Sequence, residues 1–231
     1  MHEDLDTGQI IVHGPPLTEP EDIAQLQHLD DDEVAIVVPR NTLIDFGPRG
    51  RDISPRTLDL DQFARLFGKF QHSAWHLEMR RRYAVDEATS TYAQFVRGEA
   101  PAWDLDTPWS RTIRAKTSDG AAVGRVRIVD SPPTTGQLYL LAHAEKNAAL
   151  GEDVRNMWRA EAQRVNLPDE DLWIFDSHIV ALCLFDDDDN LTGAELITEP
   201  AAVNQYNRLR DVAQHYAIPY KEFAAQLNAR E

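Results

Sequence analysis

Cysteine, long apolar runs and basic charge are all scarce in this sequence. The 231 residues contain a single cysteine, Cys183, which excludes an intramolecular disulfide and disfavours a metal site built from thiolates. No apolar run approaches the roughly 20 residues of a membrane-spanning helix. The acidic, polar start MHEDLDTGQ does not have the basic start and apolar middle of a secretory signal. We therefore expect a cytoplasmic protein that does not associate with membranes.

Acidic residues outnumber basic residues by 39 to 23, and the formal net charge is −16 at pH 7. Such a field repels the phosphates of nucleic acids and anionic membrane surfaces. The one basic run, Arg80 to Arg82, is short and has no interleaved aromatic residues, so it is a weak candidate for a nucleic-acid patch. We expect no direct binding of nucleic acid.

Familiar catalytic and cofactor motifs are also missing. The sequence contains no G-x-G-x-x-G, no P-loop, no G-x-S-x-G and no H-E-x-x-H. Cys183 lies between Leu182 and Leu184, which indicates a buried, unreactive thiol rather than a nucleophile. No catalytic residue and no cofactor can be assigned on this basis, and whether the protein is an enzyme stays open.

The first 58 residues differ in character from the rest. The β-branched runs at 9–14 and 33–39 predict strands, and the stretch between them has a helical pattern that begins at Thr18. Residues 41–57 are rich in Gly, Pro and Arg without periodicity, as in a linker. We predict a small N-terminal extension at 1–58, strand-helix-strand followed by a linker, and a main domain at 59–231.

The main domain mixes helical and strand patterns. A helix is expected from Leu58, a strand in the alternating segment that starts at Ala74, and a helix over 85–101 that ends near Gly98. Asp119-Gly120 is a strong turn dipeptide, and its flanks (109–133) predict a β-hairpin. Further on, we expect a helix that closes at Gly151, a short strand at 154–158, a short helix ended by Pro168, and helices on both sides of Pro219. The order predicts an α+β (mixed α/β) fold, in which antiparallel hairpins pack with several short helices.

Four consecutive aspartates, Asp186 to Asp189, stand between two mostly apolar runs. They do not fit the calcium-loop pattern, because the glycine comes too late and no acidic residue closes the loop. Neighbouring strand residues also point to opposite faces, so four adjacent carboxylates do not converge on one ion. We favour a solvated hairpin tip between arms at 174–185 and 191–197 over a divalent-ion site, and we assign no metal.

A basic constellation is the strongest candidate for a site. If 109–133 forms a hairpin, Arg114 and Lys116 share one face of its first strand, and Arg125 and Arg127 share one face of the second. Like charges that face each other across strands destabilise a sheet, so something negative must compensate them. The partner is either internal, for instance Glu78 or Glu152, or a bound carboxylate or phosphate that the arginines hold bidentately. The candidate ligand-binding residues are Arg114, Lys116, Arg125, Arg127, Glu78, Arg80, Arg155 and Glu152.

Five ordered segments resemble a known family. They are FxxLFxxFxxSAWHLExRxxYAV (63–85), RVRIVDSPP (125–133), NAALGEDVR (147–155), LPDEDLWIFDSHIVALCLFDDDDNLTGAEL (167–196) and RDVAQHYAIPY (210–220). Together they resemble DUF6879, an actinobacterial family of unknown function that is often encoded beside helix-turn-helix regulators. The matched polar positions are Glu78, Arg80, Tyr83, Arg125, Arg127, Asn147, Glu152, Arg155 and Asp176. Trp75-His76 and the stretch SPPTTGQLYLL depart from the aromatic-Arg patterns of relatives, which removes cations from any shared anion pocket.

Two functions remain in view. The resemblance implies a non-enzymatic cytosolic regulatory or partner-binding protein, whose partner is a protein such as a helix-turn-helix regulator. The arginine face adds an anionic small molecule as a further candidate ligand. The alternative is an enzyme that acts on a phosphorylated or carboxylate small molecule, with Glu78 and Glu152 as acid and base.

Overall fold

The structure, a computed structural model, describes residues 2–3, 10–11, 15–19, 21 and 56–229, and its contacts divide the chain into residues 1–54 and 55–231. In the first unit, β1 (His2–Glu3) pairs antiparallel with β2 (Ile10–Ile11). The strand predicted at 33–39, most of the helix that precedes it and residues 41–55 of the predicted linker lie outside the described residues. No helix within the described part of the chain is both long and apolar enough to cross a membrane.

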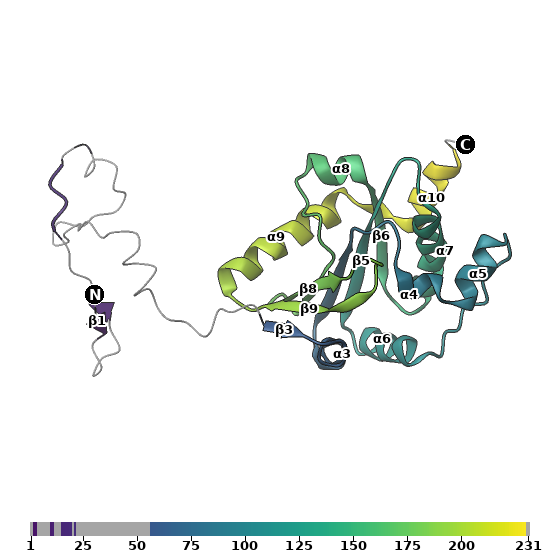
Figure 1. The fold of residues 1–231 in the computed structure, drawn as a ribbon, viewed down its shortest axis with the longest axis horizontal. Coiled ribbons are helices and arrows are strands. Elements are labelled where there is room, and N and C mark those ends of the chain that lie inside the picture. Colours follow the sequence, from purple (N-terminus) through teal and green to yellow (C-terminus); the bar gives the residue numbers. More distant parts are fainter. Residues whose placement is uncertain (1, 4–9, 12–14, 20, 22–55, 230–231) are drawn as a thin grey trace. The chain divides into compact units, whose positions relative to one another are not determined.

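The second unit is built on a mixed sheet of eight strands (Figure 1). Across the sheet the strands follow the order β10, β6, β5, β4, β7, β8, β9 and β3. Their bounds are β3 (Arg56–Leu58), β4 (Ser73–Glu78), β5 (Ala122–Val129), β6 (Asp153–Trp158), β7 (Leu172–Phe175), β8 (Ile179–Phe185), β9 (Leu191–Ile197) and β10 (Ile218–Pro219). Residues 56–58, which the sequence placed in the N-terminal segment, pair with β9 in this sheet.

Only the middle of the sheet is parallel. Strand β5 pairs in parallel with β4 on one side and with β6 on the other, and the remaining pairs are antiparallel. Parallel neighbours need crossover connections, and here helices supply them. This combination of a parallel centre with antiparallel hairpins confirms the predicted α+β class.

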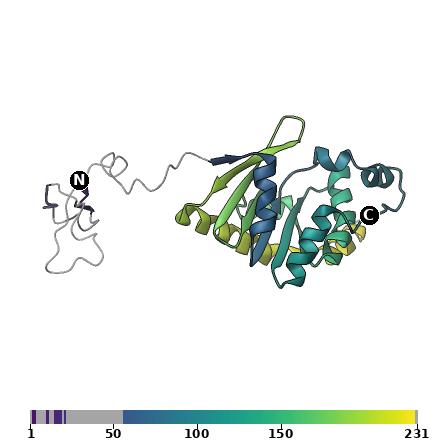
Figure 2. The ribbon, with the colours of Figure 1, turned by 90° about the horizontal axis from the view of Figure 1, so that it is seen from below.

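Helices cover both faces of the sheet. Figures 1 and 2 show α3 and α6 along one face and α9 along the opposite face. The bounds are α3 (Leu60–Lys69), α4 (Ala84–Glu87), α5 (Ser90–Val96), α6 (Pro108–Ser118), α7 (Thr135–Ala149), α8 (Arg159–Arg164), α9 (Pro200–Tyr216) and α10 (Tyr220–Asn228). The apolar core is accordingly split in two. One cluster gathers around Phe67 and Ile113, and the other packs Val126 and Val180 against Val203 of α9.

The predicted hairpin around Asp119-Gly120 is wrong, because its first arm is the helix α6. The Thr107 hydroxyl accepts the backbone N–H of Ser110 and Pro108 follows at the first helical position, which together favour a helix start. Gly120 has φ of 91° and ends the helix rather than forming a hairpin turn. The second arm is correct and forms β5.

Other elements match the sequence with local differences. The helix predicted over 85–101 is split into α4 and α5, because the Thr89 side chain caps a new helix by accepting the N–H of Tyr92. The arm predicted at 174–185 is interrupted at Asp176 and Ser177, which have positive φ and turn β7 back into β8. The hairpin with arms β8 and β9, the strand β6, the helix that closes at Gly151 and the helices on both sides of Pro219 are confirmed.

Candidate functional site

Charged side chains gather on one face of the sheet where β4 and β5 run in parallel. In their register, His76 is beside Arg125 and Glu78 is beside Arg127. Neighbouring positions in register point to the same face of a sheet, so all four side chains meet. All are buried, with Arg127 only 3% exposed. The sequence alternation of β4 and β5, apolar on one face and charged on the other, therefore places the charges inside the molecule rather than in solvent.

This network is closed by the protein's own groups. Arg125 donates from Nη1 to Glu78 at 2.9 Å, and from Nε and Nη2 to Glu152 at 2.8 and 2.6 Å. Arg127 donates from Nε to the other oxygen of Glu78 and from Nη1 to the carbonyl oxygen of Leu140 at 2.6 Å. Asn147 on α7 links the two halves, because it donates to Glu152 at 2.8 Å and accepts from Arg127 at 3.2 Å.

The electrostatics of the network follow from two carboxylates facing two guanidiniums. Burial alone would raise the pKa of Glu78, but Arg127 and Arg125 outweigh it and hold the pKa well below its ordinary range. Burial opposes the charge of Arg125, yet Glu152 and Glu78 raise its pKa above the usual value. Burial lowers the pKa of His76 to about 3, so its imidazole is neutral at pH 7. The two carboxylates and two guanidiniums of the network sum to zero net charge.

The predicted face of four cations does not exist. Arg114 and Lys116 lie on α6, since that segment is a helix and not a strand. Arg114 is exposed and donates to the carbonyl oxygen of Leu105, while Lys116 donates to that of Phe70. The negative partners of Arg125 and Arg127 are therefore the internal carboxylates of Glu78 and Glu152, and not a bound anion.

The other two cations of the predicted ligand set lie apart from the network. Arg155 is in register with Val126, whose side chain belongs to the core on the opposite face, and it pairs with Asp153 at 2.9 Å. Arg80 follows the end of β4, where it pairs with Asp189 and stacks 4.2 Å above the ring of Phe185.

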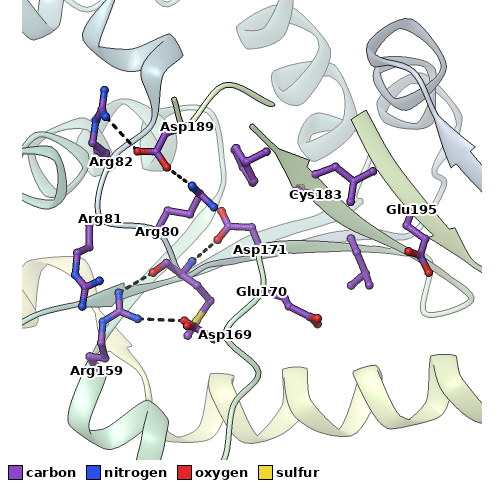
Figure 3. A pocket seen from close by; sticks show the side chains of 14 residues that line it. Arg80, Arg81, Arg82, Arg159, Asp169, Glu170, Asp171, Cys183, Asp189 and Glu195 are labelled. Atoms are coloured by element: carbon purple, nitrogen blue, oxygen red, sulfur yellow. Dashed lines mark hydrogen bonds and ion pairs between the residues drawn. The ribbon is translucent and has the colours of Figure 1, made fainter. Parts of the chain in front are cut away.

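A cleft opens at the carboxyl ends of the parallel strands β4 and β6, a place where α/β sheets commonly bind ligands. Its volume is about 630 Å³. Figure 3 shows Arg80, Arg81, Arg82 and Arg159 on one side of this strand-end cleft, with Cys183 and Glu195 on the other. The loop 169–171 that leads into β7 adds three acidic residues to the lining. The cleft is thus lined by side chains of both charges, and Asp169, Asp171 and Asp189 lie among the arginines in Figure 3.

The ion pairs of the strand-end cleft are more accessible than those of the network. Arg81 has a side chain that is 63% exposed and donates to Asp130 at 2.8 Å. Arg159 donates to the same carboxylate at 2.5 Å and to the carbonyl oxygen of Met79. Asp130 and Arg159 come directly after β5 and β6, so both residues stand at the strand ends.

The four aspartates form the tip of the β8–β9 hairpin. Asp186 caps the turn by accepting the backbone N–H groups of Asp188 and Asn190, and Asp189 pairs with Arg80 and Arg82. Two of the four carboxylates are therefore used in the turn and in pairing with the strand-end arginines. Within the described residues, no group of three or more His, Cys, Asp or Glu side chains is placed to hold a metal ion.

Sequence reasoning missed the partners that complete these sites. Asp171 is buried, accepts from the N–H of Met79 and from the hydroxyl of Tyr83, and burial raises its pKa to about 7. Asp130 and Arg159 were missed although a polar residue directly after a buried strand is a readable signal. The bonds from Asp171 to residues 79 and 83 leave no such signal, because about 90 residues separate the partners.

The family model described as "Domain of unknown function (DUF6879)" matches residues 61–225. The match spans well over half of the chain and contains β4 to β10, and with them both the buried network and the strand-end cleft. No curated protein matches the chain.

Proposed function

We propose, from the premise that this chain belongs to the DUF6879 family, that it is a non-enzymatic regulatory protein of the cytoplasm that binds a protein partner in the strand-end cleft. The observation that carries the proposal is the contrast between two sets of arginines. The arginines on the sheet pair with buried carboxylates, whereas Arg81 and Arg82 at the strand ends have exposed side chains in a cleft lined by both charges.

The free-energy cost of breaking its existing ion pair decides whether an arginine can bind an incoming ligand. An exposed ion pair contributes about 0 to 1 kcal/mol, so Arg81 or Arg82 can exchange its carboxylate for one from a partner at little cost. Separating Arg125 from Glu78 would leave a buried charge unpaired, which costs about 3 to 5 kcal/mol. Recognition is therefore assigned to the cleft, and the buried network supports the sheet beneath it.

The chemistry of the cleft favours a polypeptide segment that carries both signs of charge. Acidic side chains of the partner would meet Arg81 and Arg82, and basic side chains would meet Glu170 and Glu195. A net charge of −16 further attracts a basic protein over a distance. A DNA-binding helix-turn-helix regulator, which the family resemblance implies, has this property.

The enzymatic alternative with Glu78 and Glu152 as acid and base is opposed by the geometry. A general acid or base works best when its pKa lies near the working pH. Glu78 is held far below that range by two guanidiniums, and the side chain of Glu152 is fully buried against Arg125. An anionic small molecule on Arg125 and Arg127 would have to displace the same carboxylates.

Affinity capture from native lysate with charge-reversed variants tests the proposal. Full-length wild type should retain a partner in stoichiometric amount, and Arg81→Glu and Glu170→Lys should each lose it. Arg97→Glu and Glu145→Lys are matched controls, because both positions are exposed and do not line the cleft. Absence of any partner at mild salt, or equal retention by the cleft variants and the controls, would overturn the proposal.

A further inference from the structure

A second, smaller cavity lies over the charged face of the sheet. It has a volume of about 200 Å³ and is bounded by the buried network below, by the segment 83–86, by α7 and by the β8–β9 hairpin. Phe63, Leu140 and Trp173 supply apolar walls. A cavity of about 150 Å³ can hold benzene. This one therefore has room for a single ring with a short substituent.

The charges around this cavity do not balance. Arg125 and Arg127 are matched by Glu78 and Glu152. The lining also contains Asp189, which pairs with Arg80 and Arg82, and Asp171, which accepts hydrogen bonds from Met79 and Tyr83. Asp86, a half-buried carboxylate in the same lining, has no ion pair among the residues that the structure describes. Burial and the charge of Glu78 raise the pKa of Asp86 to about 6, and the charges of Arg127 and Arg125 offset them only in part. An unpaired carboxylate in such surroundings is costly, and a cation would compensate it.

A second, independent feature also lacks a partner. His76 lines the cavity, is 8% exposed and stacks on Trp173 at 4.3 Å, yet neither ring nitrogen makes a hydrogen bond within the described part of the chain. Its Nδ1 lies 3.4 Å from Glu78, but the neutral ring forms no ion pair there. Buried polar atoms are normally hydrogen-bonded. A neutral imidazole offers one acceptor nitrogen, which an N–H donor would satisfy.

We propose that this cavity binds a small organic cation, an ammonium or amidinium group attached to a single apolar ring. The cationic head pairs with Asp86, one of its N–H groups donates to His76, and the ring lies against Phe63, Leu140 and Trp173. This site adjoins the strand-end cleft, with which it shares Asp171, Cys183, Phe185 and Asp189. The groups that bind the cation, Asp86 and His76, do not line that cleft, so the inference does not depend on the proposed partner.

Calorimetric titration of the full chain at pH 7.5 with three ring compounds of similar size tests this site. Benzylamine, which is cationic, should bind saturably, whereas benzyl alcohol and benzoate should not. Asp86→Asn should weaken benzylamine binding at least about tenfold, which corresponds to about 1.4 kcal/mol. Asp187→Asn removes the same charge from an exposed position outside the cavity and should leave binding unchanged.

Folding measurements on the same variants separate a binding role from a structural one. His76→Phe keeps a ring against Trp173 and removes the unpaired nitrogens, so it should weaken benzylamine binding without lowering the melting temperature. Asp86→Asn should likewise melt no lower than wild type. The proposal is overturned if wild type shows no saturable benzylamine binding, if benzyl alcohol binds equally well, or if Asp86→Asn binds as wild type does.

Discussion

Replacing Glu78 with glutamine should be among the most destabilising conservative changes in the chain. The carboxylate accepts from Arg125 at 2.9 Å and from Arg127, and its side chain is only 7% exposed. Glutamine keeps the shape but leaves two guanidiniums facing the single carboxylate of Glu152. The network then carries an uncompensated buried positive charge, and Arg127 faces an amide in place of a carboxylate.

The expected loss follows from the cost of an unpaired buried charge. Removing one partner of a buried ion pair costs about 3 to 5 kcal/mol. Domains of this size have unfolding free energies of about 5 to 15 kcal/mol, so Glu78→Gln should remove about a fifth of the stability or more. With an m value of about 2 kcal/mol/M in urea, the unfolding midpoint falls by about 1.5 to 2.5 M.

Urea unfolding at pH 7, followed by circular dichroism, measures this loss. Glu99→Gln is the matched control, because Glu99 also accepts two hydrogen bonds from one arginine, at 2.7 and 2.8 Å, but is 51% exposed. That exposed pair should contribute nothing measurable. If the two variants unfold at the same urea concentration, the reasoning that burial makes the network essential is refuted.

Three further experiments test individual residues around the two sites. The folded-state pKa of Asp171 is raised to about 7 by burial, so the folded protein retains a proton that the unfolded chain releases near pH 4. Unfolding free energy should therefore fall as pH rises from 4 to 7, and Asp171→Asn should flatten that slope in urea titrations; an unchanged slope contradicts the assignment. A Cβ at Gly136 would lie 2.6 Å from the carbonyl oxygen of Arg81, so Gly136→Ala should cost about 1 to 3 kcal/mol in thermal melts, and a neutral change would show that α7 can move. Cys183 is half-buried at the wall of the cleft, where burial raises the pKa of its thiol, so a thiol reagent at pH 8 should label the native protein more slowly than the unfolded chain; equal labelling rates would contradict the raised pKa.

Local patterns predicted most elements of the main domain but misplaced one decisive segment. The run from Trp109 to Lys116 has polar residues at every second position, which suits a strand. In the helix these positions do not share one face, because Arg114 is exposed whereas Ser110 is buried. The dipeptide Thr107-Pro108 was the signal that separates the two, because it combines a cap with a residue suited to the first turn. Because Asp119-Gly120 was interpreted as a hairpin turn, Arg114 and Lys116 were predicted on a strand, whereas both lie on the helix α6.

The sequence predicted which residues form the candidate site, but it did not predict how these residues pair with one another. Glu78, Arg125, Arg127 and Glu152 were all identified from the sequence, and the structure brings them together. Whether arginines are matched internally depends on the register between β4 and β5, whose paired residues are about 50 positions apart in the chain. Local patterns cannot fix that register, since crossover connections between parallel strands vary in length.

Arginine side-chain NMR tests the central claim most directly. The claim is that Arg125 and Arg127 on the sheet are inaccessible to added anions, whereas Arg81 at the strand end is accessible. In ¹H–¹⁵N spectra of the wild-type chain, the Nε–H signals of Arg125 and Arg127 should persist from pH 5 to 8 and should not move when phosphate or citrate is added. The signal of Arg81, which is 63% exposed, should respond to the same titration. Saturable chemical-shift changes at Arg125 and Arg127, with no change at Arg81, would contradict the account. They would show that the anion binds on the sheet face.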